Sequence, residues 1–262
     1  MSTVTLQINH NVAWLTLNRE QKRNALTQEM WQQLVQYCQQ LALNDEVKVL
    51  VLTATGDKAF SAGADIEELT DIIKDSERLI ANNKVVQQAQ LLLQQLKIPT
   101  IAAINGVCVG GGMGLALACD FRICVEHAKF GITPSKLGLL YSIEDTKRLV
   151  NVVGVARAKE LLFLGKIISA EQAIAWGLVT ECVASNQLDE KVNDLIKQLL
   201  AVSRFSMAGI KTTLEYIDNA NSNGEYSHNE QAVRALFDLA FTQSDFKEGA
   251  NAFLEKRAPK FD

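Results

Sequence analysis

Two segments rich in small residues could present backbone N–H groups to a ligand. They are Phe60–Asp65, with the sequence FSAGAD, and Val109–Gly114, with the sequence VGGGMG. Consecutive glycines between a buried strand and a helix allow positive φ values and let a ligand approach the bare backbone. The first N–H groups of a helix have no partner within the helix and point toward such a ligand. Each turn is therefore a candidate oxyanion site, unless its glycines only allow a helix and a strand to pack closely.

The second segment does not fit the common nucleotide-binding motifs. In the spacing G-x-G-x-x-G the last glycine would fall on Leu115 or Leu117, and the phosphate loop GxxxxGK[S/T] does not fit either. FSAGAD ends in Asp65, which opens a predicted helix with Glu67 and Glu68 in its first turn, where acids suit the helix dipole. Two such turns could each supply one amide. A thioester carbonyl oxygen that gains charge as an enolate needs two converging donors, each worth about 3 kcal/mol of barrier.

The elements that must position these turns predict an α/β protein. The pattern predicts, in order, a hairpin around Asn9–Asn11, a helix capped by Thr27, a strand at Val47–Ala54, a long helix at Ile66–Leu96, and strands at IPTIAAI and FRICV. This order favours a largely parallel sheet covered by helices, with the site in loops at the carboxyl ends of the strands. After Val183 only helix-period segments follow, so we expect a core at residues 1–183 and a helical subdomain at 184–262.

The composition limits the classes of function. A formal net charge of -4 and a pI near 5.5 argue against a nucleic-acid binder, and only the phosphates of a small ligand remain plausible. Five cysteines without a C-x2-C pair predict reduced core residues in a cytoplasmic protein and no metal site. No leader-like segment and no apolar run of ~18 residues is present, so we expect no membrane partner.

Several separated stretches resemble the enoyl-CoA hydratase/isomerase, or crotonase, superfamily. They are NREQKRNALT, FSAGADIEEL, AAINGVCVGGGMGLALACDFRIC, SAEQAIAWGLV and EGANAFLEKRAPKF, and they occur in the family's order along nearly the whole chain. The resemblance implies a crotonase-like spiral of ββα units with a C-terminal helical region that forms trimers, often paired into hexamers. It also implies an acyl-CoA thioester substrate, bound in a bent shape, and no separate cofactor.

The resemblance also assigns roles to individual residues. It implies that the amides of Ala64 and Gly111 bind the thioester oxygen. The residues implied to contact CoA are the backbone of Ala62, Asp65 and Ile66 at the adenine, Lys22 and Arg23 beside Ala25 at the phosphates, and Phe253 and Lys256 from the C-terminal region. Without the family, the three cations among them would be interpreted as solvated surface residues.

Hydratases of this family use two glutamates for acid-base chemistry, and neither is found at the expected place. The first position corresponds to Gly114. The second follows Phe130 and Gly131 by three residues, at Pro134, or at Ser135 after a shift of one. Because glycine and proline side chains cannot transfer protons, the resemblance predicts the thioester-binding frame and leaves the reaction open.

The stretch GITPSKLGLLYSIEDTKRL offers replacements. Glu144 could be the single base of an isomerase, moving a proton between C2 and C4, or merely an acid at the start of a helix over Ile143–Val153. Tyr141 could donate to the ligand or be a buried phenol with a polar partner. TPSKLGLLYS resembles methylmalonyl-CoA decarboxylases, which have an active-site tyrosine at this position, although their histidine corresponds to Ala64. Three functions stay open: a hydratase/isomerase-like enzyme, an acyl-CoA decarboxylase and a non-catalytic acyl-CoA binder.

Overall fold

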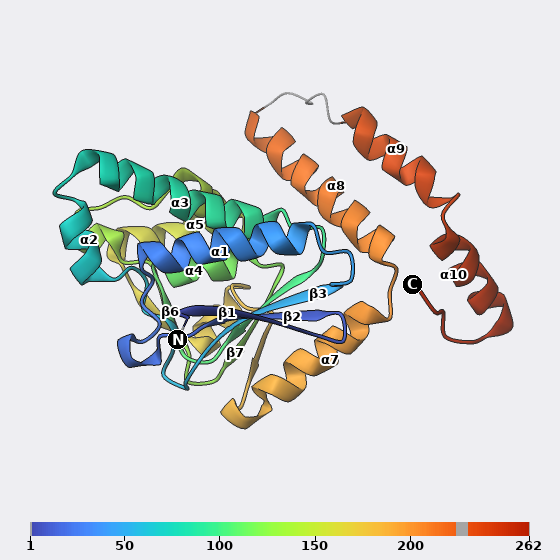
Figure 1. The fold of residues 1–262 in the computed structure, drawn as a ribbon, viewed down its shortest axis with the longest axis horizontal. Coiled ribbons are helices and arrows are strands. Elements are labelled where there is room, and N and C mark those ends of the chain that lie inside the picture. The colour runs from blue at the N-terminus through green and yellow to red at the C-terminus, as the bar shows by residue number, and fades with distance from the viewer. Residues whose placement is uncertain (1, 224–229, 262) are drawn as a thin grey trace. The chain divides into compact units, whose positions relative to one another are not determined.

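The computed structural model describes residues 2–223 and 230–261. The chain forms two compact units: the first is Met1–Leu96 with Thr100–Asn193, and the second is Lys97–Pro99 with Asp194–Asp262. The division lies within α7 (Leu188–Leu200), further along the chain than the boundary predicted after Val183. Figure 1 labels most of the helices and several strands.

Six strands form the larger sheet of the first unit. Their order is β1 (Val4–Asn9), β2 (Val12–Leu17), β3 (Val49–Ala54), β5 (Thr100–Ile104), β7 (Phe121–Val125) and β10 (Glu181–Val183). β1 and β2 are antiparallel, and all other neighbours in this sheet are parallel. The predicted hairpin is confirmed: Val4 pairs with Leu17, and His10 and Asn11 both have the positive φ of a tight two-residue turn.

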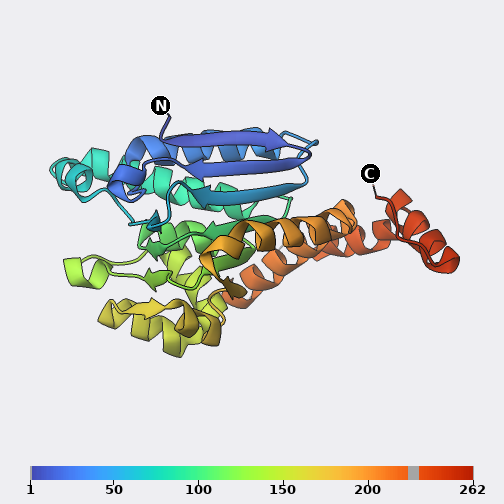
Figure 2. The ribbon, with the colours of Figure 1, turned by 90° about the horizontal axis from the view of Figure 1, so that it is seen from below.

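A second sheet carries the turns of interest. It contains β4 (Ala59–Ser61), β6 (Val107–Val109), β8 (Lys129–Gly131) and β9 (Ile167–Ser169), in that order. Each pair of consecutive strands, β3 and β4, β5 and β6, β7 and β8, gives its first strand to the larger sheet and its second to the smaller one, and a helix follows. The blue strands β1, β2 and β3 of the larger sheet lie side by side in Figure 2. Because β4, β6 and β8 are parallel, the turns that follow them leave the sheet at the same edge.

Helices cover the strands, and α1, α2 and α5 begin where the sequence predicts. In the first unit they are α1 (Gln28–Ala42), α2 (Ile66–Ile72), α3 (Ser76–Gln94), α4 (Gly111–Ala118), α5 (Ile143–Leu164) and α6 (Ala170–Ala175), with short 3-10 turns at η1 (Glu20–Lys22), η2 (Pro134–Leu137) and η3 (Ser185–Gln187). α1, α3, α4 and α5 gather on one side of the strands (Figure 1). Thr27 caps α1 by accepting a hydrogen bond from the Met30 amide at 3.3 Å, as predicted.

The single long helix predicted over Ile66–Leu96 is wrong, because the structure has α2 and α3 in its place. Asp75 interrupts the pattern: its carboxylate accepts hydrogen bonds from the amides of Glu77 and Arg78 at 2.9 and 3.2 Å and starts a new helix. N-cap acids of this kind compete with helix continuation because they satisfy the orphan amides of the next helix. The chain between Ile72 and Ser76 is therefore not helical, and α2 and α3 are separate helices.

The second unit contains only helices within its described residues. After the end of α7 these are α8 (Arg204–Asn223), α9 (Glu230–Ala240) and α10 (Ser244–Glu255), and α8 packs on α9. Phe241 makes edge-to-face contacts with Phe237 and Phe246, at centroid distances of 5.4 and 5.7 Å. Trimerisation through this region stays a prediction. No helix in the described part of the chain is long and apolar enough to cross a membrane.

Candidate active site

The turns after β4 and β6 lie against each other. Gly63 has a φ of +87° and Gly110 a φ of +53°. A Cβ on Gly63 would lie 3.1 Å from the Val109 carbonyl oxygen and 3.6 Å from the Gly111 nitrogen, and a Cβ on Gly110 would lie 3.6 Å from the Gly63 Cα. Both positions therefore need glycine for the backbone angle, and the close approach of the two turns brings the Gly111 amide next to the first turn.

Most amides in the first turn already have protein partners. The Ala62 amide donates to the Arg23 carbonyl at 3.0 Å, the Gly63 amide to Ser61 Oγ at 3.2 Å, and the Asp65 amide to the Leu26 carbonyl at 3.0 Å. The amide of Ala64, between them, has no hydrogen-bond partner in the described part of the chain.

The second turn has the same property. The Gly110 amide donates to the Gly131 carbonyl at 3.0 Å, whereas the Gly111 amide opens α4 and has no acceptor among the described residues. An amide at the first position of a helix is left unpaired by the helix itself and carries part of its positive dipole end. The fold thus brings two unpaired amides, of Ala64 and Gly111, onto neighbouring turns beside one cavity.

This cavity has a volume of about 540 Å³. Its walls come from residues 62–66 and 109–111, from one side of α2 and α3, from Leu26 and Trp31, and from part of the loop between β8 and α5. The loop supplies apolar side chains at the cavity, among them Leu140, which is 96% exposed. Helix α3 supplies carboxamides instead: Asn83, Gln87 and Gln90 recur at helical spacing and face the same space.

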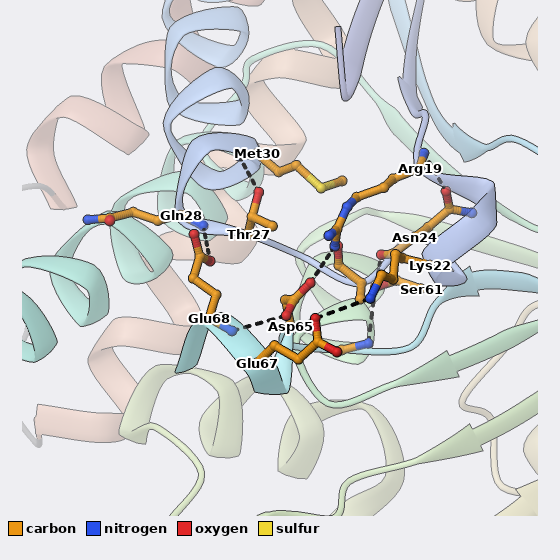
Figure 3. Close-up of polar contacts among 12 residues, drawn as sticks. Arg19, Lys22, Asn24, Thr27, Gln28, Met30, Ser61, Asp65, Glu67 and Glu68 are labelled. Carbon is orange, nitrogen blue, oxygen red and sulfur yellow. Dashed lines mark hydrogen bonds and ion pairs between the residues drawn. The ribbon is translucent and has the colours of Figure 1, made fainter. Parts of the chain in front are cut away.

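An ion pair anchors the first turn (Figure 3). Arg19 Nη1 lies 2.6 Å from Asp65 Oδ2 and 3.1 Å from the Ala25 carbonyl oxygen, and Asp65 Oδ1 accepts a hydrogen bond from the Glu68 amide at 3.1 Å, so Asp65 is also the predicted helix cap. The hydrogen bond from Arg19 holds the pKa of Asp65 below its usual 3.8. The segment before α1 and the start of α2 are thereby tied together.

The residues assigned to CoA binding fall into two groups. Lys22, Arg23 and Ala25 lie beside the turn that contains Ala62, Asp65 and Ile66, and Lys22 Nζ pairs with Glu67 Oε2 at 3.1 Å on the exposed surface. The amides of Ala62 and Asp65 donate to carbonyls of the protein. Phe253 and Lys256 lie at the end of α10 in the second unit. Their contacts with CoA stay predictions.

The two side chains assigned to chemistry differ in position. Tyr141 lines the cavity, with its hydroxyl 3.4 Å from the Gly110 carbonyl oxygen. Burial, followed by the negative charge of Asp145, raises the pKa of Tyr141 well above 10, so the phenol is a donor at neutral pH. Glu144 is exposed at the start of α5 and is not among the residues that line the cavity. The next residue, Asp145, is 5% exposed and does line it.

Sequence reasoning missed Asp145 as a cavity residue. Its carboxylate is held between two helices: Arg148 Nη1 donates to Oδ1 at 3.0 Å, and Gln90, with its amide turned by 180°, donates to Oδ1 and Oδ2 at 3.0 and 3.2 Å. A Cβ on Gly114 would collide with the Gln90 carboxamide and would lie 2.9 Å from Asp145 Oδ1. The side-chain space that Gly114 leaves empty is thus filled by this pair. The signal in the sequence was Asp145 and Arg148 at the i, i+3 spacing of a helix.

Comparisons with known proteins show the family of this chain. Residues 7–262 match the family described as enoyl-CoA hydratase/isomerase. The chain is 32% identical to the (E)-benzylidenesuccinyl-CoA hydratase of Thauera aromatica over 98% of each chain, and 32% identical to the 1,2-epoxyphenylacetyl-CoA isomerase of Escherichia coli over 100% of this chain and 98% of that one. A solved structure of an enoyl-CoA hydratase/isomerase family protein from Hyphomonas neptunium superimposes with a TM-score of 0.93 at 34% identity, covering 100% of this chain and 98% of that one. The chain belongs to the enoyl-CoA hydratase/isomerase family and has the crotonase fold.

Proposed function

We propose that this protein is an acyl-CoA lyase or isomerase that forms a thioester enolate, and that the amides of Ala64 and Gly111 hold the enolate oxygen. The observation that carries the proposal is the pair of unpaired amides on abutting turns, beside a cavity large enough for an acyl group. Removing an α-proton from a thioester moves charge onto the carbonyl oxygen, and two fixed donors stabilise that charge more than they stabilise the neutral substrate.

The chemistry of the relatives supports the same class. The named relatives comprise a hydratase and an isomerase that act on CoA thioesters of different acyl groups. Their names have in common a CoA thioester as substrate, and they differ in the reaction. The proposal for this chain therefore commits to the enolate and to a CoA thioester as substrate.

Gly111 offers a matched test of the oxyanion assignment. Gly111→Pro removes the amide hydrogen at the first helical position, where proline is tolerated. Gly111→Ala retains the amide but adds the same Cβ, 3.1 Å from Trp31 Cζ2 and 3.2 Å from Leu26 Cδ1. We expect Gly111→Pro to lower kcat at least about 100-fold below Gly111→Ala. Equal activity of the two variants would refute the role of this amide.

A decarboxylase is the second candidate function, and Tyr141 is the observation that favours it. Loss of CO2 from a malonyl-type thioester mainly needs stabilisation of the enolate, and the protonated Tyr141 hydroxyl lies in the cavity next to the turn that bears Gly111, where it could orient the departing carboxylate. Incubation with crotonyl-CoA, a 3-enoyl-CoA and methylmalonyl-CoA, followed by mass detection, separates the reactions. Turnover of methylmalonyl-CoA alone would establish the decarboxylase, and binding of all three without turnover would establish a non-catalytic acyl-CoA binder.

A further inference from the structure

A buried carboxylate lies one helical turn from the proposed oxyanion amide. Gly111 and Gly114 are three residues apart on α4, which corresponds to about 4.5 Å along the helix axis. A Cβ on Gly114 would lie 2.9 Å from Asp145 Oδ1, so the Asp145 carboxylate on α5 lies beside α4 at Gly114. Asp145 also lines the cavity.

The surroundings fix this carboxylate in one orientation. Arg148, itself 7% exposed, donates to Oδ1 at 3.0 Å and uses its Nε to bond Gln94 Oε1 at 2.7 Å. Gln90, 1% exposed, lies on the other side and reaches both carboxyl oxygens. Oδ1 thus holds the ion pair, whereas Oδ2 contacts Gln90 at 3.2 Å, and the Ser142 side chain also hydrogen-bonds the carboxyl group. Because Oδ2 does not hold the ion pair, it is the oxygen better able to take a proton.

We propose that Asp145 is the group that moves the proton at the α-carbon of the bound thioester. This inference rests on the proposed function. In the forward step the α-carbon C–H bond breaks, the proton binds Asp145 Oδ2, and the electron pair forms the enolate whose oxygen is held by the amides of Ala64 and Gly111. In the reverse step the O–H bond at Asp145 breaks and the proton returns to carbon, at C2 or, for a dienolate, at C4. No other reactant is needed.

The electrostatics suit a group that must both accept and release a proton. Burial raises the pKa of Asp145 above its usual 3.8, while the Arg148 charge and the surrounding hydrogen bonds oppose that rise. A carboxyl whose pKa lies closer to neutrality is a better acid-base catalyst than an exposed one. Glu144, which is exposed and lacks such a setting, is the rival carboxylate that the sequence suggested.

Deuterium exchange provides a direct assay. Butyryl-CoA has no double bond to hydrate and no carboxylate to lose, so incorporation of deuterium at C2 in D2O reports α-proton transfer alone. We expect the wild-type protein to exchange this proton, Asp145→Asn to exchange it at least about 100-fold more slowly, and Asp145→Glu to recover part of the loss. Glu160, a half-buried residue that pairs with Arg157 on the same helix, does not line the cavity, so Glu160→Gln serves as the control and should exchange at the wild-type rate.

Folding must be separated from chemistry, because Asp145→Asn leaves the buried Arg148 without its ion-pair partner. The double variant Asp145→Asn/Arg148→Met removes both charges and should remain folded while lacking exchange. Wild-type exchange in Asp145→Asn or in the double variant would overturn the inference, as would a loss confined to Glu144→Gln. If exchange survives in Asp145→Asn but disappears in Gly111→Pro, only the inference fails. If the wild-type protein binds butyryl-CoA yet exchanges nothing, the proposed function fails with it.

Discussion

Gly63 is the position where backbone strain and the proposed chemistry coincide, and Gly63→Ala is therefore the most informative single substitution. An alanine at φ +87° is strained, and its Cβ would lie 3.1 Å from the Val109 carbonyl and 3.6 Å from the Gly111 nitrogen. The left-handed backbone costs a non-glycine residue about 1–2 kcal/mol. The added methyl also pushes the two turns apart and misplaces a donor worth about 3 kcal/mol of barrier, so we expect kcat to fall about 100-fold.

Gly154 provides a matched control for the strain. It has a φ of +73° at the kink of α5, but a Cβ there would meet nothing within 4 Å. Its ψ is 163°, and because essentially only glycine adopts this pair of angles, Gly154→Ala should lose about 1–3 kcal/mol of unfolding free energy, a fall in Tm of about 2–12 °C. Its kcat should stay at the wild-type value.

The assay compares both variants at a temperature where each is folded, by circular dichroism for stability and by turnover of whichever thioester the wild-type protein converts. Wild-type kcat in Gly63→Ala, with the expected loss of stability, would refute the view that the contact of the two turns positions the donors. An equal loss of kcat in Gly154→Ala would show that strain alone abolishes activity.

Three further predictions concern ion pairs. Arg19→Met should lower the free energy of unfolding, measured by chemical denaturation, by about 3 kcal/mol, because Asp65 is 7% exposed and loses its ion-pair partner. Lys22→Met removes a cation from an exposed pair and should change this free energy by less than about 1 kcal/mol. Because the pKa of Asp65 is lower in the folded state, its carboxylate stabilises the fold at neutral pH, and this stabilisation is lost as the pH falls below 3.8. In Asp65→Asn, the free energy of unfolding should therefore fall less steeply with decreasing pH in the acid range. An unchanged pH dependence would contradict this assignment. Arg257 hydrogen-bonds Glu248 and lowers the pKa of that carboxyl group to about 2, and Glu248 also accepts a hydrogen bond from the Lys260 amide. Glu248→Gln should therefore speed hydrogen exchange of the Lys260 amide at pH 7, whereas in the wild-type protein this amide should lose protection only as the pH falls from 4.5 toward 2. Equal exchange in the two proteins at pH 7 would argue against these contacts.

Local patterns in the sequence were sufficient for much of the fold. The alternation around His10, the cap at Thr27 and the cap at Asp65 each depend on residues within a few positions of one another, and the structure has all three. The two glycine turns were also visible, since the positive φ of Gly63 and Gly110 needs glycine. The break at Asp75 was missed although an acid followed by Ser76 and Glu77 is a typical helix start.

The acid-base group could not be chosen from the sequence. Adjacent residues on a helix point about 100° apart, so whether Glu144 or Asp145 faces the cavity depends on how α5 is rotated against its neighbours. That rotation is set by packing among segments far apart in the chain: Gln90 on α3, Gly114 on α4 and Arg148 on α5. No local pattern contains these three residues together.

The central claim is that the amides of Ala64 and Gly111 hold the thioester oxygen. A crystal structure of the protein with bound butyryl-CoA tests it most directly. We predict that the thioester carbonyl oxygen lies about 2.7–3.1 Å from both nitrogens, which is the donor–acceptor distance of a good N–H···O hydrogen bond. A well-ordered thioester whose carbonyl oxygen contacts neither amide would contradict the account.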